Sequence, residues 1–263
     1  MAVQYSLTFP VTFHVGPLEL PAHFLLETLA YMAGFALYRV LRQRNGDALS
    51  DDRRWTILMA AALGAALGSV ALAWLQHALD SPLTTHEPLS GWHGKTIVGG
   101  LAGGTLAVEI VKRRLGETRR TGDPFVLPLA LGIAIGRVGC FLAGLGDHTE
   151  GGPTSLPWGI DFGDGIRRHP TTLYEIVALG ALAAWAIARA RHPLRREGDL
   201  FRGFFAGYAA FRFALEFLKP DDHDWLGLSA IQVVCLVVLG CYARDVVAMV
   251  QRVTPGPRTA QEG

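Results

Sequence analysis

The sequence is poor in charge, in paired cysteines and in basic residues at its start. Only 18% of its 263 residues are charged, whereas soluble domains carry roughly 25%. Its three cysteines include no CxxC pair and lie in apolar surroundings, so we expect neither a disulfide framework nor a metal site. The N-terminal stretch also lacks the basic start of a cleavable signal peptide. These absences argue against a soluble domain and against a disulfide-rich secreted one.

Long apolar runs are what the sequence has instead. A helix that crosses a bilayer needs about 20 mostly apolar residues. About seven runs meet this need, near residues 22–41, 55–75, 96–111, 124–143, 172–190, 201–218 and 228–250. The third and sixth are short or contain polar residues. We therefore predict an all-α polytopic membrane protein, with a single seven-helix membrane domain over residues 1–253 and a disordered tail over 254–263.

Basic residues predict the orientation of these helices. The loops after the first, third and fifth runs are rich in Lys and Arg, whereas the other loops and residues 1–20 are poor in them. Basic loops stay on the cytoplasmic side. We therefore expect the N-terminus outside and the C-terminus inside. Close packing of neighbouring helices is predicted by three pairs of glycines one turn apart: Gly64 and Gly68, Gly99 and Gly103, Gly132 and Gly136.

Several ionisable residues fall inside the apolar runs. Such residues are costly in a bilayer and usually face a protein interior or a water-filled cavity. They are Glu27, Arg137, Glu175, Arg212 and Glu216. A tyrosine, Tyr208, precedes Arg212 by four residues and so lies on the same helix face. The predicted topology places most of this set toward the outer side.

More polar residues are predicted at the same outer mouth. They are His93, Lys95, Asp147, His148 and His169. One polar cavity that opens to the outer leaflet would gather them with the buried charges. His148 and His169 are candidates for a general base, although each taken alone fits an ordinary polar loop position better.

Two interpretations of the buried charges are open. In the first, Arg212 and Glu216 form a structural ion pair one turn apart, and Arg137 pairs with Glu175 or Glu27. In the second, the two arginines bind an anion, because a guanidinium grips phosphate with two hydrogen bonds and does not lose its proton. We favour the second, since a buried ion pair rarely repays its desolvation. An anion at this depth, with Lys95 as a third positive charge, suggests a phospholipid headgroup.

The motifs around these residues resemble those of the bacterial prolipoprotein diacylglyceryl transferase family. The resemblance covers roughly residues 20 to 245 and keeps the order of the family's motifs. They read Gly136-Arg137-Val138-Gly139-Cys140-Phe141, Pro157-Trp158-Gly159, His169-Pro170-Thr171-Thr172-Leu173-Tyr174-Glu175, Gly207-Tyr208-Ala209-Ala210-Phe211-Arg212, Glu216-Phe217, and Ser229 with Gln232. The family is similar in having seven spans with the N-terminus outside.

The resemblance implies a reaction and its partners. The family transfers the diacylglyceryl group of phosphatidylglycerol to the thiol of a lipobox cysteine in a prolipoprotein, and releases glycerol phosphate. Arg137 and Arg212 would hold the phosphate, with Tyr208 and Glu216 orienting the lipid and Arg212. The other polar residues at the mouth would contact substrate. The implied site faces the outer side of the bacterial inner membrane, among membrane lipids, and we expect no cofactor and no nucleic-acid partner.

The sequence also departs from the family pattern. Cys140 stands where the family has Asn, and the following Asn-Gly-Glu reads Ala143-Gly144-Leu145. The family's essential histidine aligns with Val98, and a tyrosine usual in the first span aligns with Glu27. We therefore predict a divergent branch that either acts on another acceptor or uses His148 or His93 as the base. We interpret Cys140 as a small apolar filler rather than a covalent nucleophile.

Three functions remain open on the sequence alone. The first is the family's own transfer reaction. The second is a transferase of the same fold with a different acceptor. The third is a phospholipid-binding or transport protein without chemistry, against which the absence of a convincing internal repeat counts. Release of glycerol phosphate separates the first two from the third, and lipidation of a lipobox peptide separates the first from the second.

Overall fold

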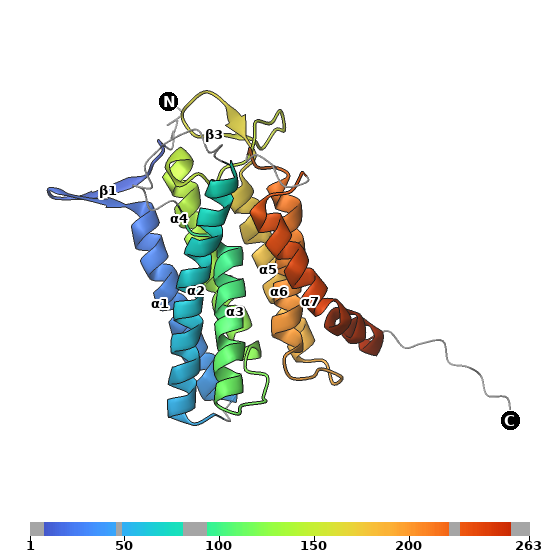
Figure 1. Cartoon of the computed structure of the whole chain (residues 1–263). Helices are drawn as coiled ribbons and strands as arrows, with labels where there is room; N and C mark the ends of the chain where they lie inside the picture. Colours follow the sequence, from blue (N-terminus) through green and yellow to red (C-terminus); the bar gives the residue numbers. More distant parts are fainter. Residues whose placement is uncertain (1–7, 46–48, 81–93, 221–226, 254–263) are drawn as a thin grey trace.

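The computed structural model describes residues 8–45, 49–80, 94–220 and 227–253, and these residues form seven α-helices that run side by side as a bundle (Figure 1). Each helix coincides with one of the predicted spans to within a few residues. The helices are α1 (Ala22–Asn45), α2 (Asp51–Asp80), α3 (Ile97–Arg114), α4 (Val126–Ala143), α5 (Thr171–Ala190), α6 (Asp199–Glu216) and α7 (Ala230–Val253). The predicted all-α fold is thereby confirmed.

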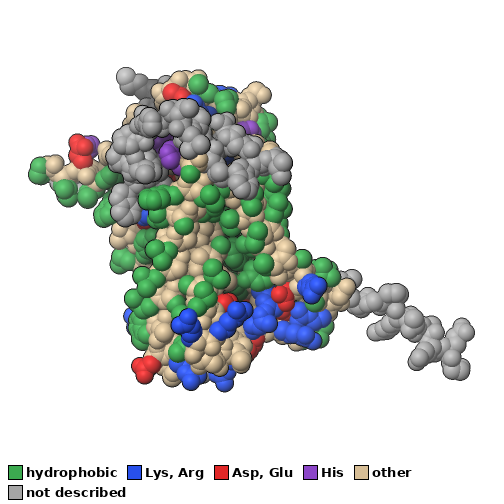
Figure 2. All heavy atoms as spheres, viewed as in Figure 1, with side chains coloured by type: hydrophobic (Ala, Val, Ile, Leu, Met, Phe, Trp, Pro, Cys, Tyr) green, Lys and Arg blue, Asp and Glu red, His purple; other side chains and the backbone are tan. Residues whose placement is uncertain are grey.

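The outside of the bundle is built to face lipid. Among the described residues, α1, α2, α4, α5 and α7 are long and apolar enough to cross a membrane. Large apolar side chains such as Leu67 and Val177 are more than two-thirds exposed, and hydrophobic side chains cover the visible sides of the bundle (Figure 2). Soluble proteins rarely expose apolar patches on this scale. The chain is therefore a multi-pass membrane protein.

The remaining two helices, α3 and α6, are the shorter and more polar ones, as the sequence indicated. Each has 18 residues, which corresponds to a length of about 27 Å. α6 buries Phe204, Phe205 and Tyr208 in the core cluster of the bundle, together with Leu179 of α5 and Cys235 of α7. α6 therefore owes its place to packing against its neighbours rather than to a uniformly apolar surface.

The two ends of the bundle differ in structure and charge. One end, here called the hairpin end, carries a hairpin of β1 (Thr12–Val15) and β2 (Leu18–Pro21), the short strands β3 (Ile160–Asp161) and β4 (Arg167–Arg168), and the single turn η2 (Gly144–Asp147). The other end carries the α1–α2, α3–α4 and α5–α6 connections and the turn η1 (Asp123–Phe125). Lys and Arg gather there (Figure 2), so we call it the arginine end.

Glycines set the closest helix contact, between α2 and α3. A methyl group on Gly68 would lie 2.4 Å from the carbonyl oxygen of Gly99, and one on Gly64 would lie 2.6 Å from that of Gly103. Only glycine allows such an approach. Two of the predicted glycine pairs therefore pack against each other. In the third pair, Gly132 faces α1, whereas a methyl group on Gly136 would meet no described atom within 4 Å.

Buried carboxylates fix the arginine end of α6. Asp199 is 3% exposed, and its carboxylate accepts hydrogen bonds from Arg189 at 3.4 Å and from Arg252 at 3.2 Å. Asp123 accepts from the backbone amides of Gly198 and Phe201, both at 3.0 Å. Anions at a helix N-terminus are favourable, because the first amides there have no partner within the helix. These contacts hold α4, α5, α6 and α7 together at this end.

Candidate functional site

The hairpin half of the bundle contains a buried charge network that joins three helices. Arg137 of α4 forms an ion pair with Glu175 of α5, with 2.9 Å between Nε and Oε2. Tyr208 of α6 donates a hydrogen bond of 2.6 Å to the other oxygen of Glu175. All three residues are at most 9% exposed. The chain thus places a positive charge, a negative charge and a phenol at one point in its interior.

A second buried pair lies on α6 itself. Arg212 and Glu216 are one turn apart, with 2.8 Å between Nη1 and Oε2, and their exposures are 4% and 0%. Arg212 follows Tyr208 by one turn on the same face of α6, and Tyr208 bonds to Glu175. The structure therefore brings together five of the predicted site residues. It also contains the ion pairs of the first interpretation, Arg212 with Glu216 and Arg137 with Glu175.

These ion pairs leave hydrogen-bonding capacity unused. Among the described residues, Nε of Arg137, Nη1 of Arg212 and both carboxylate oxygens of Glu216 are buried without a well-aligned hydrogen-bond partner. Buried polar groups are nearly always hydrogen-bonded, so such exceptions need a cause. The attraction between the charges is present, but the donors point partly away from their carboxylates. Donors of this kind suit an anion that binds in addition to the carboxylates.

Local structure explains where Glu175 lies. Pro170 directly precedes α5, and Thr171 at its start donates a hydrogen bond to the carbonyl oxygen of Thr149. This bond ties the helix to the connection that follows α4. Glu175, just over one turn into α5, then faces α4 and α6 rather than solvent. The helix start therefore sets the depth of the carboxylate.

A second polar cluster lies at the hairpin end of α4. His23 of α1 and Asp147 of η2 are 3.2 Å apart, between Nδ1 and Oδ1. Together with Cys140 in the last turn of α4, they place one nitrogen, one sulfur and one oxygen within 4.8 Å of one another. Arg137 connects this cluster to the buried network, since its Nη1 lies 3.6 Å from the sulfur of Cys140.

The sequence interpretation missed His23 and assigned Cys140 to packing. Gly139 lies at this helix contact, where a methyl group would be 3.3 Å from the Cα atom of His23 and would push the helices slightly apart. Gly144 then ends α4 with a φ of 62°, which turns the chain back so that Asp147 reaches the same point. One sequence signal was available: His23 precedes Glu27 by four residues, so the two share a helix face.

Glu27 and Lys95 form a third, more exposed group at the same end. Their side chains are 2.9 Å apart, and the hydroxyl of Tyr31 donates a hydrogen bond of 3.2 Å to Glu27. The hydrogen bond to this carboxylate raises the pKa of the Lys95 ammonium, so Lys95 is cationic at neutral pH. The interaction links α1 to the start of α3. His23 lies near enough to Glu27 and Lys95 to interact electrostatically with both.

The predicted histidines occupy different environments. His169 is half-buried, and its Nδ1 lies 3.2 Å from the hydroxyl of Tyr174, which also accepts a hydrogen bond of 2.8 Å from Trp158. His148 is exposed and adopts a left-handed backbone conformation at the end of η2. His93 lies outside the described residues. Among the described residues, the predicted set is therefore divided over four places rather than gathered in one cavity. These are the buried network, the His-Cys-Asp cluster, the Glu27–Lys95 pair and a separate histidine–tyrosine contact.

Val98, which the resemblance places at the family's histidine, lies in an apolar environment. Val98 is 1% exposed and belongs to the apolar core. The polar residues just before it are Thr96, which caps α3, and Lys95, which pairs with Glu27 of α1. The described polar residues at the hairpin end therefore include Lys95, Glu27, His23 and Asp147.

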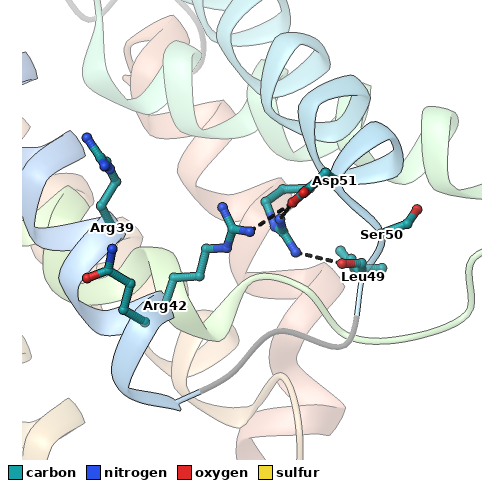
Figure 3. Close-up of a pocket in the computed structure, with 7 residues that line it drawn as sticks. Arg39, Arg42, Leu49, Ser50 and Asp51 are labelled. Carbon is teal, nitrogen blue, oxygen red and sulfur yellow. Dashed lines mark hydrogen bonds and ion pairs between the residues drawn. The ribbon is translucent and has the colours of Figure 1, made fainter.

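A cavity at the opposite end is separate from this site. It has a volume of about 560 Å³ and is lined by residues of the first basic loop and the helices beside it, including Arg39 and Arg42 (Figure 3). Arg42 and Arg54 both contact Asp51 there. None of the predicted site residues lines this cavity.

Comparison with known proteins identifies the relatives of this chain. A profile of the family described as prolipoprotein diacylglyceryl transferase matches residues 10–244. The chain is 34% identical over 247 residues to the phosphatidylglycerol–prolipoprotein diacylglyceryl transferase of Bordetella bronchiseptica, covering 87% of this chain and 88% of that protein. It is 32% identical to the protein of the same name from Geobacter sulfurreducens, with coverages of 87% and 88%. The protein of that name from Nitratidesulfovibrio vulgaris is 31% identical, with coverages of 90% and 92%.

Proposed function

The chain belongs to the prolipoprotein diacylglyceryl transferase family, and from this premise we propose how its buried charges carry the reaction. It is a transferase that moves the diacylglyceryl group from phosphatidylglycerol to a prolipoprotein. We propose that the acceptor atom is the thiol of a lipobox cysteine. We also propose that the hairpin end faces outward from the bacterial inner membrane, because the basic loops lie at the opposite end.

Arg137 and Arg212 bind the phosphate of the lipid in this proposal. The observation that supports it is the pair of buried guanidinium groups, on α4 and α6, whose N–H donors are not fully used by Glu175 and Glu216. Transfer of the glyceryl carbon to sulfur leaves the bonding electrons on a phosphate oxygen. The negative charge on phosphate therefore grows in the transition state, and preorganised cations stabilise it.

The two carboxylates act as positioning residues. Glu175 forms an ion pair with Arg137 through one carboxylate oxygen and accepts a hydrogen bond from Tyr208 at the other. Glu175 is thereby fixed, and it keeps the side chain of Arg137 in one orientation. Glu216 does the same for Arg212 from one turn further along α6. They also neutralise both arginines when no lipid is bound, since an unpaired buried charge is expensive. The arginines are then oriented before the substrate arrives, which lowers the cost of binding it.

The remaining predicted residues border the entrance. Lys95 carries positive charge at the hairpin end and can attract an anionic headgroup, with Glu27 fixing its position. His169 lies beside Tyr174 and Trp158, and Trp158 is 55% exposed. The amphipathic ring of Trp158, at the hairpin end of the bundle, suits the interface between lipid and water. We assign these residues to lipid and peptide binding rather than to bond making.

The decisive test is release of glycerol phosphate from phosphatidylglycerol by the purified protein. We expect release only with a peptide that contains the lipobox cysteine, and we expect the peptide to gain the mass of a diacylglyceryl group. The control peptide carries serine in place of that cysteine. Release at the same rate with either peptide, or without any peptide, would contradict the assignment of a thiol acceptor.

A further inference from the structure

The His23, Cys140 and Asp147 cluster has the composition of a metal site. A neutral imidazole nitrogen, a thiolate sulfur and a carboxylate oxygen are the three ligand types that Zn²⁺ accepts together. The candidate ligand atoms all lie within 4.8 Å of one another, and the closest pair is 3.2 Å apart. Ligands from α1, α4 and η2 converge there although they are far apart in the sequence, so motif spacing alone had given no indication of a metal.

The surroundings also resemble the supporting shell of a metal site. Asp147 receives a hydrogen bond from Thr149 to its second oxygen, at 3.3 Å, which leaves Oδ1 for His23 or an ion. Carboxylate ligands are usually held by such a partner. Arg137 approaches the sulfur of Cys140 at 3.6 Å and can donate to a thiolate. The positive charge of Arg137 is compensated by Glu175, and the two anionic ligands neutralise a divalent ion.

The cluster is open on one side. The side chains of His23 and Asp147 are 31% and 18% exposed, and Cys140 is only partly buried. Structural zinc sites use four protein ligands, whereas reactive sites use three and leave a position for water or substrate. Within the described residues this group has three ligand atoms, which is the pattern of a reactive site.

We propose that His23, Cys140 and Asp147 bind a zinc-type divalent ion, and that its fourth position takes the acceptor cysteine as a thiolate. The second half of this proposal rests on the proposed function. A thiol that coordinates such an ion is deprotonated outright, and the thiolate is the reactive form of cysteine. The site thus supplies what the family histidine, replaced by Val98, does not.

The chemical step balances with this assignment. The acceptor thiol gives its proton to solvent when it binds the metal. Its sulfur then attacks the glyceryl carbon that bears the phosphate, a C–S bond forms, and the C–O bond to phosphate breaks. The electron pair of that bond leaves on glycerol phosphate, beside Arg137 and Arg212. Neither oxidant nor reductant is needed.

Metal binding can be tested without measuring activity. The full-length protein, purified in detergent without a histidine tag and stripped with a chelator, is titrated with Zn²⁺ and with Co²⁺ alone. We expect one equivalent per chain and, with Co²⁺, a thiolate-to-metal charge-transfer band. His23→Gln, Cys140→Ser and Asp147→Asn should each lose the tight equivalent, and Cys140→Ser should lose the band. Thr149→Val should weaken binding by about 10–100-fold.

The control variants change the same residue types elsewhere. His14→Gln, Cys241→Ser and Asp164→Asn alter exposed side chains and should retain one equivalent. Thermal unfolding of each variant separates loss of the ligand from loss of the fold. Failure of the parent protein to bind a metal, or equal binding by the ligand and control variants, would overturn the proposal in favour of a hydrogen-bonded triad.

The acceptor half has its own readout. Adding the lipobox peptide to the Co²⁺ protein should strengthen the charge-transfer band, because a second thiolate enters the coordination sphere, and the serine peptide should not. Metal binding without any response to the cysteine peptide would overturn the acceptor role. The titration does not depend on turnover. A protein that binds metal and peptide but releases no glycerol phosphate would therefore contradict the proposed function and leave the metal site standing.

Discussion

Replacing Arg137 or Arg212 with lysine should lower turnover far more than it lowers stability. Lysine keeps the positive charge, so Glu175 and Glu216 each retain a cationic partner and no buried carboxylate is left unpaired. It loses the planar fork, however. Arg137 places one nitrogen 2.9 Å from Glu175 and another 3.6 Å from Cys140, and a single ammonium cannot hold Glu175 and also present two donors to phosphate.

The size of this effect follows from the number of donors lost. Removing one preorganised donor from a developing anion typically lowers kcat by about 10²–10³-fold, which is about 2.7–4 kcal/mol. We expect each lysine variant to fall in this range. In the double variant, kcat should fall by less than the product of the two single-variant factors, because both arginines act on the same phosphate.

The assay is peptide-dependent release of glycerol phosphate, with kcat and KM determined separately against phosphatidylglycerol in mixed micelles. Arg202→Lys is the matched control, because Arg202 also lies on α6 and pairs with a carboxylate, Asp245, but at the arginine end. It should retain near-parental turnover. A kcat within about threefold of the parent for both Arg137→Lys and Arg212→Lys would falsify the phosphate-binding role.

Three further predictions concern the interactions that hold the site in place. Gly68→Ala should lower the free energy of unfolding by about 1–3 kcal/mol, since its methyl group would lie 2.4 Å from a backbone oxygen of α3, whereas Gly180→Ala on α5 has open space and should be neutral in thermal unfolding. Asp199→Asn should cost about 3–5 kcal/mol, because it leaves the buried Arg189 and the partly buried Arg252 without their anion; an unchanged unfolding temperature would contradict this. Tyr208→Phe should cost about 1.5–3 kcal/mol through its lost bond to Glu175, and its kcat should fall less than that of the arginine variants; a larger fall in kcat would indicate direct contact with the lipid.

Much of the fold could be predicted because the membrane imposes a simple pattern. A run of about 20 apolar residues has few alternatives to a helix in lipid, and the seven predicted spans correspond to α1–α7. The weaker signals of α3 and α6 have a physical cause. Both helices lie against neighbours that cover part of their surface, so residues such as Gly99 and Arg212 replace lipid-facing side chains.

The site was predictable where a charge lay inside an apolar run. Arg137, Glu175, Arg212 and Glu216 stand out for that reason, and the structure brings them together with Tyr208. Which carboxylate pairs with Arg137 could not be chosen, because the choice between Glu175 and Glu27 depends on the rotation of α4 against its neighbours. Glu27 pairs instead with Lys95.

His23 and Cys140 escaped prediction for a different reason. Each is unremarkable within its own helix: one is a polar residue at a helix start, and the other is a small residue in an apolar run. Gly139 lies at the close contact of α1 with α4, and the positive φ of Gly144 turns the chain at the end of α4, before Asp147. The glycine at position 144 is typical of a helix end, but neither it nor the i, i+4 spacing of His23 and Glu27 shows which residues of α1 and α4 meet.

The position of Arg137 between the two clusters has a mechanistic consequence. Displacement at carbon requires the attacking sulfur and the departing oxygen on opposite sides of the glyceryl carbon. Arg137 contacts Glu175 of the proposed phosphate-binding network with one nitrogen and Cys140 of the proposed metal site with another. The attacking sulfur and the departing phosphate oxygen would then lie on two different sides of the Arg137 guanidinium. The resemblance places Val98 and Cys140 at the family's histidine and asparagine. Under the proposed function, the arginine half of the site is therefore kept, and the changed side is the one that activates the thiol.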